Sequence, residues 1–277
     1  MTAAATENDG VVRDVRKKYG EIAKSGGGCG CGPSSCCEPA ELPASIALGY
    51  RKDEINALPE GADLGLGCGA PIAQLGLAAG ETVLDLGSGA GIDAFLAARE
   101  VGPEGRVIGV DMTPEMIERA RANAAKVGAS HVEFREGRLE ALPVDDASID
   151  AVTSNCVINL VPDKRQVFAE VARVLKPGGR LVISDIVLDG RLPESVEKDV
   201  YAYVGCISGA AGRQDYFGQV RAAGLGEAEI LKDVDYLAGL KASAPQEAEA
   251  LLARTGVRWE DVAGKVRSIT FRARKGS

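Results

Sequence analysis

The feature that most constrains the fold of this chain is a run of strand-forming residues that passes through three closely spaced glycines into a helical pattern. Residues 82–85 form the expected strand, Gly87, Gly89 and Gly91 form a tight turn, and residues 93–99 have helical spacing. Glycine has no Cβ, so the backbone of such a turn can lie directly against a ligand. The stretch predicts a strand, a turn and a helix, with a ligand at the turn.

Two acidic residues near this turn indicate the kind of ligand. A dinucleotide-binding turn would carry GxGxxG and deliver a pyrophosphate to the helix N-terminus, whereas here the glycines alternate and Asp85 comes just before them. A carboxylate suits a cation better than a phosphate. The next strand, residues 106–110, is followed by Asp111, where an acid can bind a ribose. S-adenosylmethionine (SAM) has a ribose and cationic groups but no phosphate, and the chain resembles class I SAM-dependent methyltransferases.

Alternating strands and helices continue through the middle of the chain. Further strands are expected at 131–134, 149–154 and 180–185, with helices from 114 and over 166–175. This pattern predicts an α/β fold with a doubly wound, Rossmann-like methyltransferase sheet, an N-terminal cysteine-rich arm and a smaller C-terminal α+β region. We expect residues 1–70 to form a cap and the arm, 71–190 the SAM-binding core, and 191–277 a region that completes the acceptor site.

Composition and charge exclude several classes of partner. The net charge of −8 and the lack of a long basic run oppose binding to a phosphate backbone, so nucleic acid is not an expected partner. The first ten residues are polar, and no apolar run approaches membrane-spanning length. We expect a cytoplasmic monomer without a membrane partner.

Seven cysteines are too many to ignore in a reducing compartment, where permanent disulfides are rare. Four of them, Cys29, Cys31, Cys36 and Cys37, lie in a segment rich in glycine and serine. This segment is either a linker with incidental cysteines or a flexible arm with thiol chemistry. Zinc is disfavoured because a second CxxC pair is missing and the sole histidine, His131, is distant in the sequence.

The other three cysteines are expected near the cofactor crevice. Cys68 lies in a glycine-rich loop before the first strand, Cys156 follows the fourth strand, and Cys206 lies in the C-terminal region. Ligands bind beyond the carboxyl ends of parallel strands, so Cys156 is expected where a methyl group would be presented. Three soft thiolates suit a soft, three-coordinate centre. Trivalent arsenic is such a centre, and its lone pair is a nucleophile that needs no general base.

Five motifs together resemble those of arsenite methyltransferases: GCG at 67–69, DLGSGAG at 85–91, DMT at 111–113, SNCVINLVPDK at 154–164 and GC at 205–206. The resemblance covers roughly residues 36–206. It implies transfer of a methyl group from SAM to arsenite, or to thiol-conjugated arsenite, in arsenic detoxification. It also implies that Cys68, Cys156 and Cys206 bind As(III). Cys36 or Cys37 would deliver the arsenic or reduce the methylated product, and thioredoxin or glutathione would restore the thiols.

The same resemblance implies a set of cofactor-binding residues. Asp85 and the glycine turn would bind the methionine part of SAM, and Asp111 the ribose. Many methyltransferases of this class have an acid after the glycine that follows the third strand, but this chain has Arg138, which moves the adenine contact to Leu139 and the adjacent backbone. The full set is Asp85, Gly87, Ser88, Gly89, Gly91, Asp111, Met112, Gly137, Arg138, Leu139 and Asn155.

Two other functions remain open at this point. A SAM-dependent methyltransferase of a small organic acceptor would use the same core, with incidental cysteines. A non-enzymatic metalloid-binding protein would need the thiols but not Asp85 or Asp111.

Overall fold

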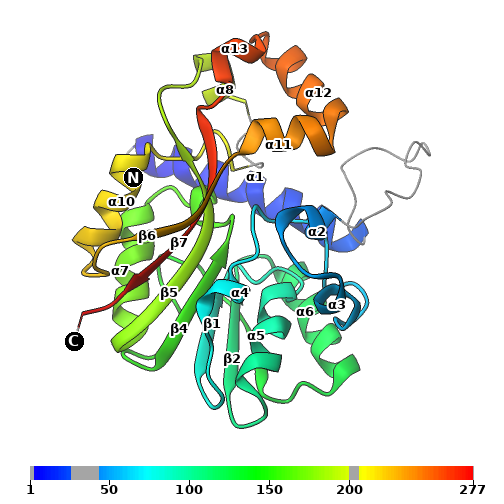
Figure 1. Ribbon diagram of the computed structural model, residues 1–277, viewed down its shortest axis with the longest axis vertical. Helices are drawn as coiled ribbons and strands as arrows, with labels where there is room; N and C mark the ends of the chain where they lie inside the picture. Colours follow the sequence, from blue (N-terminus) through cyan, green and yellow to red (C-terminus); the bar gives the residue numbers. More distant parts are fainter. Residues whose placement is uncertain (1–2, 26–43, 200–205, 277) are drawn as a thin grey trace.

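A computed structural model describes residues 3–25, 44–199 and 206–276 of the chain. Its centre is a twisted sheet with helices on both faces (Figure 1). Seven strands of the described residues form this sheet in the order β3-β2-β1-β4-β5-β7-β6, with β1 to β5 parallel and β7 antiparallel to both β5 and β6. The strands are β1 Thr82–Leu86, β2 Arg106–Asp111, β3 Val132–Glu136, β4 Ile149–Asn155, β5 Leu175–Leu188, β6 Glu229–Asp235 and β7 Val266–Arg274. This arrangement confirms the predicted Rossmann-like methyltransferase fold.

The helices form three groups around the sheet. Helices α5 and α6 pack with α4 on one face, α7 and α10 cover the other, and α1 lies across the carboxyl end of the parallel strands (Figure 1). The segment between β6 and β7 adds α11 to α13. The helices are α1 Ala3–Ser25, α2 Ala44–Leu48, α3 Lys52–Asn56, α4 Ile72–Leu75, α5 Ile92–Val101, α6 Pro114–Val127, the 3-10 helix η1 Ile158–Leu160, α7 Lys164–Val174, α8 Glu194–Glu197, α10 Arg213–Ala222, α11 Tyr236–Ser243, α12 Pro245–Thr255 and α13 Trp259–Val262.

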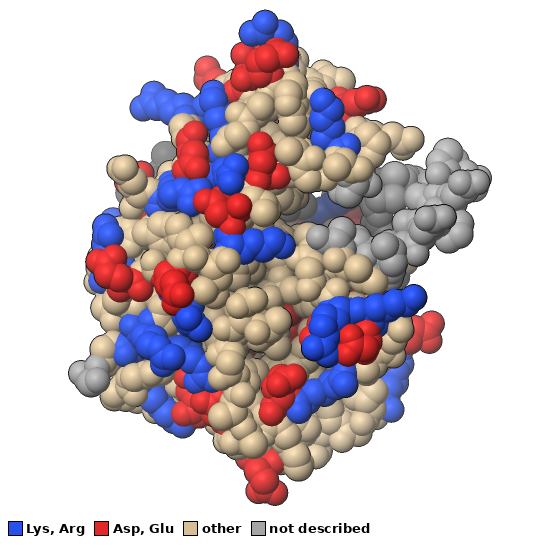
Figure 2. All heavy atoms as spheres, in the orientation of Figure 1, with Lys and Arg blue, Asp and Glu red and all other residues tan. Residues whose placement is uncertain are grey.

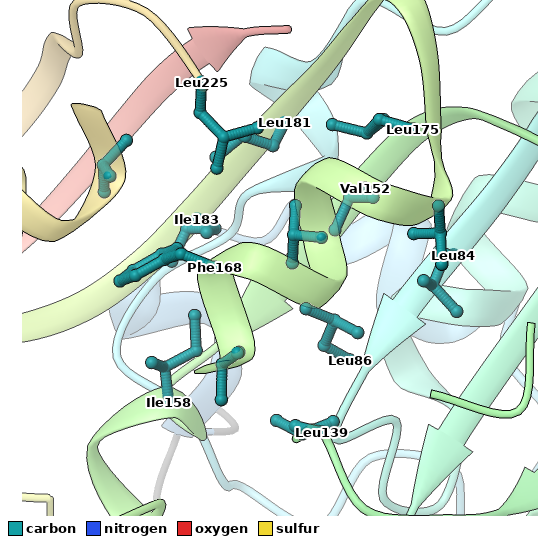
Figure 3. Close-up of a cluster of buried hydrophobic side chains, with 14 of the residues drawn as sticks. Leu84, Leu86, Leu139, Val152, Ile158, Phe168, Leu175, Leu181, Ile183 and Leu225 are labelled. Carbon is teal, nitrogen blue, oxygen red and sulfur yellow. The ribbon is translucent and has the colours of Figure 1, made fainter. Parts of the chain in front are cut away.

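Alternate residues of the central strands bury opposite faces of the sheet. Leu84 and Leu86 of β1 lie in the apolar layer under α7, whereas Val83 between them lies in the layer under α5. Figure 3 shows the first layer, in which Phe168 of α7 lies beside Ile183 of β5. Each such side chain contributes roughly 1.5–3 kcal/mol when fully buried. These two layers hold the carboxyl ends of the strands in fixed positions.

The C-terminal strands extend the main sheet. β7 pairs with β5 along nine residue pairs, and β6 forms the edge beyond it. The sheet therefore includes strands after residue 190, where the sequence predicted that the SAM-binding core ends and a C-terminal region begins. None of the described helices is long and apolar enough to cross a membrane.

Local sequence signals locate most of the elements to within a few residues. The helix expected over 166–175 begins two residues earlier, because the Asp163 carboxylate accepts a hydrogen bond from the Arg165 backbone N–H (3.1 Å) and caps it. Residues 176–179, between the expected helix and the expected strand at 180–185, lie within β5 at a register shift against β4. Helices α11 to α13 were not predicted.

Positive and negative side chains alternate over the face of the molecule shown in Figure 2. Many are paired across elements: Arg180 of β5, for example, contacts Glu81 (2.7 Å) and donates to the carbonyls of Leu75 and Gly76 at the end of α4. This face therefore has no extended patch of a single charge sign among the described residues. The Arg180 contacts tie the segment before β1 to β5.

Candidate functional site

A cavity of about 250 Å³ opens at the carboxyl end of the sheet, under α1. This volume is near the lower end of the range for small-molecule sites, roughly 300–1,000 Å³. Its walls come from segments after several different strands and from α1. They include residues 64–67, 87–90, 111–113, 137–140, 155–157 and 160–162, together with Val12, Val15, Tyr19, Ala62, Met116, Cys206 and Tyr236.

The three glycines of the turn after β1 have different structural roles. Gly87 has φ +68°, and a Cβ there would lie 2.4 Å from the side chain of Val157. Gly89 has φ +52° and lines the cavity, and a Cβ there would meet no atom within 4 Å. Gly91 does not line the cavity, and its Cβ would lie 2.6 Å from Phe95. Gly87 and Gly91 are therefore needed for packing, while Gly89 leaves space that a ligand can fill.

Asp111 lies at the cavity wall directly beside this turn. Its carboxylate accepts hydrogen bonds from the backbone N–H groups of Gly89 (3.0 Å) and Thr113 (2.8 Å), which fix both of its oxygens. Burial raises the pKa of Asp111, although these hydrogen bonds act in the opposite direction. Ser88, also in the wall, has a buried hydroxyl without a hydrogen-bond partner in the described part of the chain. The wall thus presents a fixed acid to a ligand, whereas the Ser88 hydroxyl is buried, with the Ser88 side chain against Gly109 of β2.

Asp85 lies behind the glycine turn and does not line the cavity. It is buried, and among the described residues one of its oxygens has no hydrogen-bond partner. Asp93 lies close to it and is held by the hydroxyl of Tyr50 (2.8 Å) and the amide of Asn155 (3.2 Å). Burial is the main cause that raises the pKa of both acids, and the charge of Asp93 raises the pKa of Asp85 further. The backbone of the turn therefore separates Asp85 from a ligand in the cavity.

The opposite wall contains the segment expected to contact adenine. Met112, Gly137, Arg138 and Leu139 all line the cavity. Arg138 forms an ion pair with Glu140 (2.6 Å), and the Leu139 side chain packs into the core. The apolar surface here comes from Met112 and Leu139, which suits a flat aromatic group.

Cys68, Cys156 and Cys206 come together at the end of the cavity nearest β4. All three pack in one apolar cluster, and Cys68 and Cys206 both influence the pKa of the Cys156 thiol. Cys206 also contacts the Cys156 carbonyl (2.7 Å). Cys156 and Cys206 line the cavity, whereas Cys68 is buried beside Cys156. In this arrangement no group of three His, Cys, Asp or Glu side chains among the described residues forms a metal site.

The backbone is strained at two of these cysteines. Cys156 has φ +60° and Cys206 has φ +63°, in the left-handed region that non-glycine residues rarely adopt. The N–H of Cys156 donates to the Ser184 carbonyl of β5 (2.8 Å), which helps to hold the strained turn. Such strain costs of order 1–3 kcal/mol per residue and is found most often at functional sites.

The pKa values of all three thiols are raised above the usual cysteine value. Burial raises the pKa of Cys68. The hydrogen bond with Cys156 raises the pKa of Cys206 well above its usual value, and burial adds to this. For Cys156, the hydrogen bond with Cys206 lowers the pKa, but the bond with Cys68 and burial outweigh it. Burial of the cysteines beside each other therefore disfavours their thiolate forms.

A second set of residues holds the Cys68 loop by its backbone. The side-chain oxygen of Asn155 (Oδ1) accepts a hydrogen bond from the Cys68 N–H (2.9 Å). The Ser268 hydroxyl donates to the Cys68 backbone carbonyl (2.7 Å). The Asn155 amide also donates to the Gly69 carbonyl (2.8 Å). A Cβ on Gly69 would lie 2.5 Å from the Ser184 hydroxyl, so only glycine fits there. Asn155 was expected to bind cofactor; it lines the cavity, and its amide contacts this loop.

Sequence reasoning missed several residues of the site. Ser268 lies 200 positions from Cys68, and no local pattern marks it. Helix α1 was expected to cap the domain, but its Tyr19 also reaches the cavity, where burial, Cys206, Cys156 and Asp111 raise its pKa. The helical spacing of Val12, Val15 and Tyr19 was the available signal. Cys29, Cys31, Cys36 and Cys37 lie outside the described residues.

Comparisons with known proteins agree on one family. A methyltransferase domain family matches residues 77–237. The chain is 50% identical over 225 residues to an arsenite methyltransferase of Halobacterium salinarum, covering 78% of the chain and 57% of that protein. It is 36% identical to an arsenite methyltransferase of Aquipseudomonas alcaligenes, covering 79% and 63%. The chain thus spans about six tenths of the length of these relatives.

A solved structure supports the same assignment. The arsenic (III) S-adenosylmethionine methyltransferase from Chlamydomonas reinhardtii is 33% identical, with a TM-score of 0.61 over 86% of this chain and 75% of that one. The chain therefore belongs to the arsenite methyltransferase family of class I SAM-dependent methyltransferases.

Proposed function

We propose that this chain transfers the methyl group of SAM to As(III) bound by Cys68, Cys156 and Cys206. One observation carries the proposal: a single cavity is lined at one part by Asp111 and the glycine turn and at another by Cys156 and Cys206. A methyl donor and a thiol-bound acceptor could therefore meet inside it, which is the arrangement that methyl transfer needs.

The residues of the cavity fit SAM. Asp111 would accept the ribose hydroxyls, and the open space at Gly89 would receive the methionine part. Met112 and Leu139 would enclose the adenine. When bound, SAM supplies an electrophilic methyl group on a sulfonium sulfur.

Neutral thiols suit the capture of arsenite. Arsenous acid carries three hydroxyl groups, and each can condense with one thiol to form an As–S bond and release one water. Three thiols therefore give three waters, and no free proton is gained or lost. The raised thiol pKa values support this route, since each proton needed for a departing hydroxyl is already on a sulfur.

The arsenic lone pair is the nucleophile, so the chain needs no general base. Methylation formally oxidises As(III) to As(V). We propose that two cysteine thiols, one of them Cys36 or Cys37, then return it to As(III) by forming a disulfide. Thioredoxin or glutathione, the thiol reductants of the cytoplasm, would restore the thiols. The cell would thereby convert arsenite to methylated arsenicals, as detoxification requires.

The test is methyl transfer from labelled SAM to arsenite by the reduced protein with excess thiol, followed by speciation of the arsenic products. Cys156→Ser is expected to lose at least about a hundredfold in turnover, because serine binds As(III) poorly, and to keep its SAM affinity. Wild-type turnover in that variant would refute the role of Cys156. Bound SAM without any methylated arsenic from the wild type would refute the proposed acceptor.

A further inference from the structure

Asp185 is a buried carboxylate in β5, the strand that pairs with β4 just before Cys156, and the mechanism above does not use it. It lies in β5 and is 0% exposed. The backbone carbonyl of Ser184, the residue before it, accepts a hydrogen bond from the Cys156 N–H (2.8 Å). The side chain of Ile186, the residue after it, packs in the same apolar cluster as the three cysteines. The Asp185 backbone therefore lies next to Cys156, and its side chain points to the opposite face of β5 from Ile186, toward Asn159 and Tyr216.

Both oxygens of Asp185 are held by hydrogen-bond donors. One accepts from the Asn159 amide (2.8 Å) and the Ile186 N–H (2.9 Å), and the other from the Tyr216 hydroxyl (2.9 Å). Burial raises the pKa of Asp185 to about 6, which still leaves it ionised at neutral pH. A buried charge of this kind usually costs stability, so its presence favours a role beyond folding.

The charge of Asp185 reaches all three cysteines, since it raises the pKa of each of their thiols. The nearby cation is Lys164 of α7, which is 9% exposed and donates to the Val161 carbonyl (3.2 Å). Lys164 lowers the pKa of Cys206 and also that of Asp185. Asp185 and Lys164 therefore act on the Cys206 thiol in opposite directions.

We propose that Asp185 supplies the fixed negative charge that stabilises the positive charge developing on arsenic during methyl transfer. This inference rests on the proposed function. As(III) bound to three sulfurs is neutral. Its lone pair forms the As–C bond while the methyl–sulfonium bond breaks, and the electron pair of that bond remains on sulfur. Arsenic is formally oxidised to As(V) and gains the positive charge that the sulfonium loses, and no proton moves.

The position of Asp185 gives this charge its catalytic effect. An anion near the arsenic stabilises the transition state, in which arsenic is partly cationic, more than the ground state, in which arsenic is neutral. Asp185 acts through its field and does not need to touch arsenic. The donors around it keep the charge in place, so little reorganisation is needed during the reaction.

The test compares three variants at about pH 8, above the pKa of Asp185. Asp185→Asn keeps the shape of the side chain and removes its charge. Tyr216→Phe removes a hydrogen bond to Asp185 but keeps the charge. Lys164→Met removes the opposing cation. The measurements are the single-turnover rate of arsenite methylation, the affinities for SAM and arsenite, and the thermal unfolding midpoint.

We expect Asp185→Asn to lower the single-turnover rate roughly ten- to hundredfold. Its affinities and its unfolding midpoint should match or exceed those of the wild type. Tyr216→Phe should stay within about threefold of the wild-type rate, and Lys164→Met should be faster than the wild type.

Three results would overturn the inference: a wild-type rate in Asp185→Asn, an equal loss in Tyr216→Phe, or a slower rate in Lys164→Met. If Asp185→Asn does not fold, the rate of Lys164→Met still tests the role of the Asp185 charge. A wild type that binds SAM but does not methylate arsenite would contradict the proposed function instead.

Discussion

Asn155→Ala tests how the thiol site is assembled. The Asn155 side chain contacts the Cys68 N–H (2.9 Å), the Gly69 carbonyl (2.8 Å), the Tyr50 hydroxyl (2.8 Å) and Asp93 (3.2 Å). It therefore joins the Cys68 loop to the buried acids behind the glycine turn. Alanine would remove all of these contacts without changing the charge of the protein.

The expected loss of stability follows from the two backbone groups that would be left without a partner. The Cys68 N–H and the Gly69 carbonyl belong to buried residues, and an unpaired buried polar group costs roughly 1–3 kcal/mol. Asn155 lines the cavity, so water can replace part of the loss. We expect Asn155→Ala to lose about 2–4 kcal/mol of unfolding free energy. At roughly 2–4 °C per kcal/mol, the melting temperature should fall by about 5–15 °C.

Urea and thermal unfolding measure the loss, and equilibrium dialysis measures arsenite affinity, which should fall at least about tenfold because Cys68 is no longer held beside Cys156. Ser154→Ala, one residue away on β4, is the matched control. The Ser154 hydroxyl is buried and has no hydrogen-bond partner among the described residues, so its removal should change stability by less than about 0.5 kcal/mol. Equal stability and arsenite affinity in the two variants would refute this reasoning.

Two further predictions use glycine geometry and pH. Gly89→Ala should lose about 1 kcal/mol of stability from its positive φ and at least about tenfold in SAM affinity, because its methyl would enter the cavity. Gly128→Ala, with φ +63° and open space around it, should lose similar stability but no SAM affinity; equal SAM affinities would contradict this. Asp185 has a folded pKa of about 6, above its unfolded value, so the folded state binds the extra proton. The contribution of Asp185 to the unfolding free energy should therefore fall as pH rises from about 4 to about 6. Across that range, urea unfolding should show that Asp185→Asn becomes more stable relative to the wild type. Parallel stability–pH profiles of the two proteins would contradict this prediction.

The order of strands and helices was predictable because it depends on local patterns. Strand-forming residues before Gly87 and helical spacing after Gly91 define β1 and α5 within one short stretch. The unpredicted helices α11 to α13 follow β6, where the regular alternation had already stopped. Residues 176–179 lie within β5 at the register shift between Leu175 and Arg180, where they have no β4 partner among the described residues and Gly178 keeps the positive φ of a turn.

The sequence by itself determined that this chain forms a SAM-methyltransferase sheet, that Asp111 follows β2 and that Cys156 follows β4, since these facts follow from neighbouring residues along the chain. Only the tertiary structure decided the placement of Asp85 behind the turn, the hydrogen bond from Ser268 to the Cys68 carbonyl, and the position of Asp185 in the strand next to Cys156. These contacts join residues far apart in the sequence, and they arise from burial and strand register. Burial beside one another also sets the thiol pKa values, which no sequence pattern encodes.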